Sequence, residues 1–181
     1  MKILGIDPGL RKTGWGVVLW KKNSFSYLDD GFFFQNDKLE LGQKLLKIFD
    51  SLNFLIKKSK PDVIGIEQTF VGSGSVSSLK LGMARGVCIL TAAKLGIKIL
   101  EIQPKLVKKN ITGSGSASKE QVNQMVKTIL NVVPKNEDSS DALAVAMSIQ
   151  SKSIGKLDNG QYSSNLDKAI ANALEKEKIN I

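Results

Sequence analysis

The sequence predicts an α/β fold: a mixed five-stranded sheet flanked by helices. Three strand-like segments joined by short connections open the chain, and an antiparallel meander is the simplest pairing for them. Two more strands follow, each preceded by a helix, and connections of this βαβ kind place strands in parallel. Helices complete the pattern, and no internal repeat is visible.

The strands are predicted from short apolar or β-branched runs bounded by turn residues. The first run, KILGI, ends at Asp7, and Pro8-Gly9 imposes a turn directly after it. In the second run, TGWGVVLW, Gly14 and Gly16 indicate a close approach of another backbone or a bulge. The expected strands are residues 2–6, 13–20, 25–34, 62–66 and 97–102.

The helices are predicted from a change of period. From Leu39 onward apolar residues recur every three or four positions, which is typical of an amphipathic helix, and Lys60-Pro61 ends it. Ser118 and Gln121 have the spacing of a capping box at the start of a later helix. The expected helices are about residues 39–59, 76–95, a short one from Pro104, 118–130 and 138–150.

The 181 residues suit one domain, which we place at residues 1–150. Residues 151–164 are polar and contain glycine, so they are expected to be flexible. Residues 165–178 have the spacing of a short helix, but their single apolar stripe is too narrow to be stable unless it docks. We therefore predict a flexible tail over residues 151–181.

Composition narrows the function. The chain carries a net charge of +9, which favours a polyanionic partner, although a lysine-rich composition also reflects codon bias. Histidine is absent, so histidine triads, bases and metal ligands are excluded. The lone Cys88 is expected to be a buried small side chain. No run approaches the roughly 18 apolar residues of a membrane span and no export signal precedes the first strand, so we expect a cytoplasmic protein.

Two carboxylates follow strands that are expected to be parallel. Asp7 ends the first strand and Glu67 ends the fourth, and function gathers at the carboxyl ends of such strands. Each also has an ordinary explanation: Asp7 precedes a Pro-Gly turn, and Glu67 is a strand-end charge. If the two strands are neighbours, however, the acids repel each other unless a divalent cation lies between them. Magnesium prefers such oxygen ligands.

Two further acids, Asp138 and Asp141, open the last predicted helix. Their i, i+3 spacing places them on one face of its first turn. Acids at a helix start are also favoured by capping and by the helix dipole, so the helix alone favours a structural cap. The apolar ALAVAM that follows predicts a buried helix, which would hold both acids against the sheet.

Four blocks of sequence, in order, resemble the RuvC family of Holliday junction resolvases. They are GIDPG followed by TGWGVV, IEQTF running on into SLKLGMARGV, VKKNITGSGSASKEQVNQMV, and DSSDALAVA. Together they span residue 1 to about residue 150. GIDPG alone is weak, because sugar kinases and other RNase H-like proteins begin similarly, whereas the four blocks together are specific.

The resemblance implies an RNase H-like fold and paired, symmetric, metal-dependent nicks in four-way DNA junctions during recombination and repair. It makes Asp7, Glu67, Asp138 and Asp141 the catalytic, metal-binding acids. Some family members have a histidine where Asp138 stands, so this chain carries the all-carboxylate version. Two Mg²⁺ ions roughly 4 Å apart are expected, with Mn²⁺ as a substitute.

The resemblance also implies DNA contacts and partners. Lys108 and Lys119 match lysines near the scissile phosphate, but they are equally explained as solvated charges. Phe70 matches an aromatic residue inserted among junction bases, although an aromatic after a strand is otherwise usually core. The helix at residues 76–95 has small and apolar positions that suit a homodimer. A branch-migration complex of the RuvA and RuvB type would deliver the junction.

Two other functions stay open. One is a catalytically silent DNA-binding protein, which should have lost at least one of the four acids, and none is lost. The other is an RNase H-like enzyme with a different target, such as an RNA–DNA hybrid, whose 2′-hydroxyl contacts a sequence does not reveal.

Overall fold

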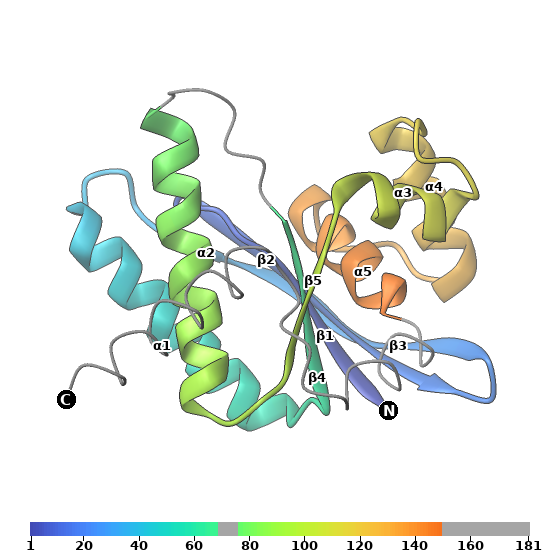
Figure 1. The fold of residues 1–181 in the computed structure, drawn as a ribbon, viewed down its shortest axis with the longest axis horizontal. Coiled ribbons are helices and arrows are strands. Elements are labelled where there is room, and N and C mark those ends of the chain that lie inside the picture. Colours follow the sequence, from blue (N-terminus) through green and yellow to red (C-terminus); the bar gives the residue numbers. More distant parts are fainter. Residues whose placement is uncertain (69–75, 150–181) are drawn as a thin grey trace, which may run out of the picture. The chain divides into compact units, whose positions relative to one another are not determined.

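The computed structural model describes residues 1–68 and 76–149, and its strands form one mixed sheet in the order β3-β2-β1-β4-β5 (Figure 1). The strands are β1 (Lys2–Asp7), β2 (Lys12–Lys21), β3 (Ser24–Phe34), β4 (Val63–Glu67) and β5 (Ile99–Ile102). β1 pairs antiparallel with β2 and parallel with β4, and β5 is parallel to β4. This confirms the predicted sheet, with an antiparallel meander followed by βαβ units.

Helices cover both faces of the sheet (Figure 1). They are α1 (Leu41–Ser59), α2 (Val76–Lys94), α3 (Pro104–Thr112), α4 (Lys119–Leu130) and α5 (Glu137–Ser148). α1 and α2 pack on one face, where Leu4, Ile6, Ile64 and Ile66 of the central strands form a core with Ile48 of α1. α5 lies on the opposite face, with α3 and α4 packed around it.

Glycines let α5 approach the sheet closely. A Cβ atom at Gly5 of β1 would collide with the carbonyl oxygen of Ala142, and one at Gly14 of β2 would collide with that of Asp138. At Gly16 it would lie 2.6 Å from the side chain of Leu143. The close approach expected at Gly14 and Gly16 is therefore confirmed, and the backbone of α5 rests directly on β1 and β2.

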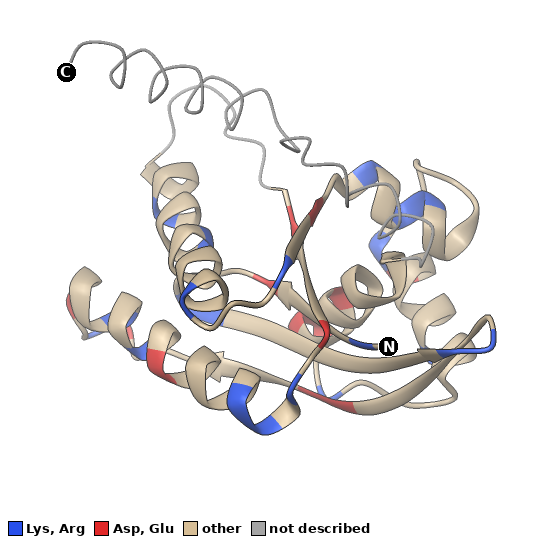
Figure 2. Ribbon diagram, turned by 60° about the horizontal axis from the view of Figure 1, so that its bottom comes forward, with Lys and Arg blue, Asp and Glu red and all other residues tan. Residues whose placement is uncertain are grey.

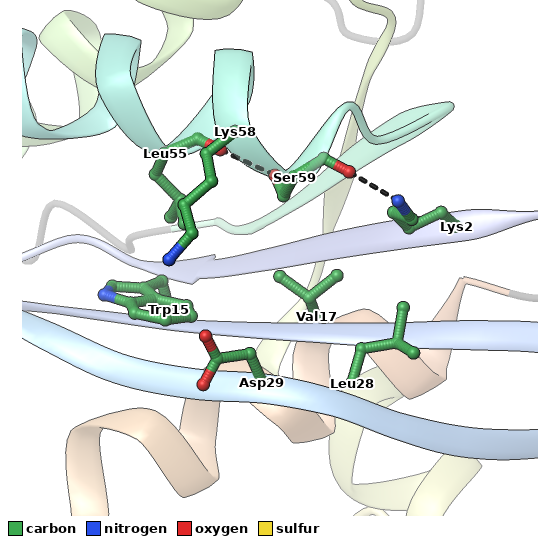
Figure 3. Close-up of a pocket in the computed structure, with 8 residues that line it drawn as sticks. All are labelled: Lys2, Trp15, Val17, Leu28, Asp29, Leu55, Lys58 and Ser59. Carbon is green, nitrogen blue, oxygen red and sulfur yellow. Dashed lines mark hydrogen bonds between the residues drawn. The ribbon is translucent and has the colours of Figure 1, made fainter.

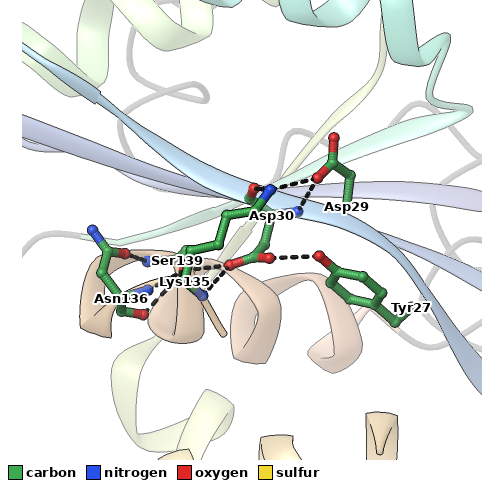
Figure 4. Close-up of polar contacts among 6 residues, drawn as sticks. All are labelled: Tyr27, Asp29, Asp30, Lys135, Asn136 and Ser139. Carbon is green, nitrogen blue, oxygen red and sulfur yellow. Dashed lines mark hydrogen bonds and ion pairs between the residues drawn. The ribbon is translucent and has the colours of Figure 1, made fainter. Parts of the chain in front are cut away.

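Asp30 ties the edge strand β3 to the start of α5 (Figure 4). This carboxylate is 1% exposed. It accepts hydrogen bonds from the Tyr27 hydroxyl at 2.6 Å, the Ser139 hydroxyl at 2.6 Å and the backbone N–H of Lys135 at 2.8 Å. The Lys135 ammonium donates to the backbone carbonyl of Asp30 at 2.6 Å and to the carboxylate of Asp29 at 2.8 Å. The turn before α5 is thus fastened to the sheet edge.

α2 is the one helix of the described ranges that is long and apolar enough to cross a membrane by length and composition. It carries Lys80 and Arg85 along its length, and charges are costly inside a bilayer. Ala84 and Cys88 of this helix are buried in the core shared with α1. One side of α2 therefore packs on this core while much of the helix is exposed, and Cys88 is the buried side chain that was expected.

Several other predictions can be compared with the structure. The Ser118–Gln121 capping box starts α4 as predicted. Thr112 ends α3, so the following loop begins at Gly113, whose φ of 84° terminates the helix. Phe70 and the predicted tail at 151–181 lie outside the described residues.

The glycine contacts generate a stability prediction. Gly5→Ala forces α5 away from the sheet, so we expect a loss of about 2 kcal/mol or more in the free energy of unfolding, measured in urea. Gly42→Ala is the matched control, because a Cβ there meets nothing within 4 Å and should be neutral or stabilising. Equal stability of Gly5→Ala and the wild-type protein would show that α5 does not rest on β1.

The Asp30 contacts generate a second prediction. Asp30→Ala leaves the Tyr27 and Ser139 hydroxyls and the Lys135 N–H without their acceptor, and should cost about 2 to 4 kcal/mol of unfolding free energy. Its neighbour Asp29 is 46% exposed in its ion pair with Lys135, so Asp29→Ala should cost under about 1 kcal/mol. A similar loss in both variants would argue against the buried contacts as the cause.

Candidate active site

Asp7 and Glu67 end neighbouring parallel strands. They follow Ile6 and Ile66, which are paired in the register of β1 and β4. Because side chains alternate along a strand and both isoleucines face the core under α1 and α2, both acids face α5. The turn after Asp7 is held by Thr13, whose buried hydroxyl donates to the carbonyl of Gly9 at 2.8 Å. Asp7 and Glu67 therefore lie side by side at the carboxyl ends of neighbouring strands, as predicted.

Asp138 and Asp141 lie in the first turns of α5. The N-cap of this helix is Asn136, whose side chain accepts from the backbone N–H of Ser139 at 2.8 Å, and Ser139 completes a capping box. The helix-cap interpretation of Asp138 is therefore wrong. Since the carbonyl of Asp138 rests against Gly14, beside the Asp7 position of β1, the start of α5 lies next to the strand-end acids.

The four acids influence one another electrostatically. Burial, together with the negative charges of Asp141, Glu67 and Asp138, raises the pKa of Asp7 from 3.8 to about 7. Burial, followed by the charge of Asp141, also raises the pKa of Glu67. Acidic segments of β4 and α5 and basic segments of α3 and α4 occupy the same region (Figure 2). Without a cation, the site therefore disfavours full ionisation.

Lysines surround the acids. The Lys119 ammonium lies 3.0 Å from the carboxylate of Asp141, and this contact raises the pKa of Lys119. Lys108, Lys119, Glu67 and Asp141 line one cavity of about 250 Å³. The structure therefore places both predicted lysines beside two of the predicted acids. Phe70, the remaining predicted contact, lies outside the described residues.

The donor set fits a hard divalent cation. All four side chains offer carboxylate oxygens, the ligands that Mg²⁺ and Mn²⁺ prefer. In residues 1–68 and 76–149 no three acids stand ready-made around one ion position. Asp141 is turned toward Lys119, and Asp138 toward Lys12 at 3.9 Å. The ammonium groups of Lys12 and Lys119 thus offset part of the negative charge of these two carboxylates.

A second cavity, of about 270 Å³, lies on the other face of the sheet between α1 and β1 to β3 (Figure 3). It is lined largely by apolar groups of Trp15, Val17, Leu28 and Leu55. The Lys2 ammonium at its edge donates to the carbonyl of Ser59 at 2.6 Å. The sheet separates this cavity from the four acids, so it does not belong to the same site.

Sequence reasoning missed Lys12, Asn136 and Asp30. Two adjacent acids inside a strand, Asp29 and Asp30, were a signal, because one of them must face the buried side and needs partners. Asn136 stands two positions before Asp138, and asparagine is a favoured N-cap residue. This signal was missed because the nearby aspartates are favoured N-cap residues too. Lys12 gave no signal, since its approach to Asp138 depends on how β2 is placed beneath α5.

Most of this chain is similar to proteins of one known family. The family model described as crossover junction endodeoxyribonuclease RuvC matches residues 3–149. A protein of that name from Ruegeria pomeroyi is 45% identical over 148 residues, covering 81% of this chain and 89% of the relative. Another from Ruminiclostridium cellulolyticum is 45% identical over 149 residues, covering 81% and 90%.

Solved structures give the same result. RuvC from Thermus thermophilus has a TM-score of 0.74 and 26% identity, over 82% of this chain and 92% of that one. The same protein in complex with a Holliday junction substrate has a TM-score of 0.77 and 27% identity, over the same shares. The yeast mitochondrial resolvase Ydc2, at 14% identity and a TM-score of 0.58, shares the fold. With the family model matched from β1 through α5 and the acids assembled where those elements meet, this chain belongs to the RuvC family of crossover junction endodeoxyribonucleases.

Proposed function

We propose that this protein resolves four-way DNA junctions by paired, symmetric nicks that depend on Mg²⁺, with Mn²⁺ as a substitute. The observation that carries the proposal is the electrostatic coupling of carboxylates from β1, β4 and α5: the charges of Asp141, Glu67 and Asp138 raise the pKa of Asp7, and that of Asp138 raises the pKa of Asp141. Family membership supports the reaction class, and a relative solved with a Holliday junction substrate supports the target.

Each residue has a role in this proposal. Asp7, Glu67, Asp138 and Asp141 would hold two divalent ions, which would supply a polarised attacking water and positive charge at the scissile phosphate. Lys119, whose ammonium lies 3.0 Å from the Asp141 carboxylate, would contact a phosphate oxygen of the DNA. Lys108 lies across the same cavity and contacts the DNA backbone. Since the chain has no imidazole, the water's proton passes to solvent, a carboxylate or a lysine.

We further propose a homodimer formed through α2. Its Leu79 and Leu90 are each 61% exposed. A Cβ added at Gly82 or Gly86 meets nothing within 4 Å, so a partner helix has room to approach at these positions. A two-fold dimer would present two active sites together, as paired nicks require.

The remaining expectations are proposals as well. A cytoplasmic location and delivery of the junction by a branch-migration complex of the RuvA and RuvB type follow from the family. Insertion of Phe70 among the bases at the junction centre is also implied by the family, because Phe70 matches the family's aromatic position in the IEQTF block.

Cleavage of a synthetic four-way junction tests the reaction. With Mg²⁺ we expect symmetric nicks confined to the junction, and none in EDTA. Asp7→Asn should lower the cleavage rate by several orders of magnitude while junction binding is retained, because the metal site loses a charge and the basic surface is unchanged. Denaturing gels give the nicks, and gel shifts give the binding.

A linear duplex of matching sequence is the control substrate, and Asp37→Asn, which alters an exposed acid paired with Arg11, is the control variant. Equal cutting of the linear duplex would point to a differently targeted nuclease. Full cleavage activity in Asp7→Asn would contradict the proposed role of Asp7 in binding metal. Junction binding without any cleavage would identify a catalytically silent binding protein.

The raised pKa of Asp7 predicts how stability depends on pH in EDTA. The folded protein holds this proton more tightly than the unfolded chain, so the stabilisation is complete below about pH 4 and is lost as the pH rises through about 7. Asp7→Asn has no such proton. Relative to wild type it should therefore gain stability between pH 4 and pH 8, by at most about 4 kcal/mol.

Urea unfolding of both proteins at each pH measures this difference. Adding Mg²⁺ at pH 8 should stabilise the wild-type protein much more than Asp7→Asn, because the ion binds only the folded carboxylates. A stability difference that does not change between pH 4 and pH 8 would contradict the electrostatic cost assigned to Asp7.

A further inference from the structure

Two phenylalanines are exposed on β3 beside the active site. Phe32 is 43% exposed and Phe34 is 53% exposed, whereas Phe33 between them packs against the core on the other face. β3 is an edge strand, and an apolar edge strand left open invites aggregation. Neither ring has a function in the site described above.

The strand register places these rings on the same face as the acids. Asp7 pairs with Gly14, Gly14 pairs with Phe32, and Lys12 pairs with Phe34. Directly paired residues point to the same face of a sheet, so Phe32 and Phe34 share the face of Asp7. Two strand spacings separate the Cα atoms of Asp7 and Phe32, which is about 10 Å.

Lys12 connects the two groups. Its ammonium lies 5.7 Å from the ring centroid of Phe32 and 3.9 Å from the carboxylate of Asp138. The cation therefore stands between the acidic site and the exposed rings. A DNA strand passing from Asp7 toward β3 would meet the Lys12 ammonium first and the phenylalanine rings next.

This order matches how proteins hold an unstacked nucleic-acid strand. Such sites combine cations that follow the phosphates with aromatic side chains on which bases stack. Sheet surfaces present aromatic rings in this way. At about 3.4 Å per stacked nucleotide, 10 Å corresponds to about three nucleotides, and to fewer where the strand is unstacked.

We propose that Phe32 and Phe34 form a base-stacking platform for the DNA strand being cut, with Lys12 contacting a phosphate between the platform and Asp7. The platform rests on the proposed function, because it needs the scissile phosphate at the four acids. It holds bases within about three nucleotides of the cut, on one side only. It is separate from Phe70, which follows β4.

Affinity for a four-way junction, measured by fluorescence anisotropy in EDTA so that nothing is cut, is the first test. The double variant Phe32→Leu/Phe34→Leu should bind on the order of tenfold more weakly, because leucine keeps apolar area and loses the ring. Phe32→Tyr/Phe34→Tyr should bind as the wild type does. Phe54→Leu is the matched control, since this residue is 69% exposed on α1 across the sheet.

A fluorescent base in the DNA reports base stacking directly, at a chosen position, rather than overall affinity. After the cut is mapped, 2-aminopurine is placed at each of three positions on either side of it. Stacking on a phenylalanine should change the emission at one or two positions on one side only. The change should persist in the tyrosine variant and in Phe54→Leu, and disappear in the leucine variant.

The outcomes separate the two proposals. A wild-type protein that cuts junctions, with affinity and emission unchanged in the leucine variant, overturns the platform and leaves the proposed function standing. A loss of affinity without any position-dependent emission change also overturns it, because the rings would then contact DNA without stacking. A wild-type protein that neither binds nor cuts a junction ends the proposed function, and the platform with it.

Discussion

The contact between the backbone of α5 and the sheet is the constraint on which the rest of the structure depends. Glycines stand at the points of closest approach, at Gly5 of β1 and at Gly14 and Gly16 of β2. Any side chain there would raise the helix by at least the size of a methyl group. The helix would then carry Asp138 and Asp141 away from Asp7 and Glu67, so a packing requirement sets the geometry of the active site.

The same contact brings negative charges close together, so the fold must hold α5 in place against their repulsion. Four carboxylates approach one another in a partly buried site, where burial and mutual repulsion raise the pKa of Asp7 and Glu67. Tethers at the start of α5 oppose its displacement. Asn136 caps the helix, and Asp30 at the sheet edge accepts a hydrogen bond from the Ser139 hydroxyl. Asp30 is buried and accepts from three donors, so it fixes the helix start to the sheet edge.

The two faces of the sheet have different roles. On one face, β1 and β4 supply isoleucines to a core with α1 and α2, and the outer surface of α2 exposes Leu79 and Leu90. On the other face, the same strands end in acids, and β3 extends that surface with exposed phenylalanines. Because side chains alternate along a strand, each strand serves both faces at once. Core and site are therefore built from neighbouring residues.

The sequence by itself determined the order of strands and helices, since hydrophobic period and turn residues are local properties of the chain. It also placed Asp7 and Glu67 at the ends of parallel strands and Asp138 and Asp141 at the start of a buried helix. The family motifs added the metal-binding role of Asp138 and the two lysines, Lys108 and Lys119. Only the tertiary structure decided that Asn136, and not Asp138, caps α5. It alone brought Lys12 to Asp138, buried Asp30, and set Phe32 on the face of Asp7. These contacts depend on cross-strand register and on the resting place of α5, and both are set by packing between segments far apart in the chain.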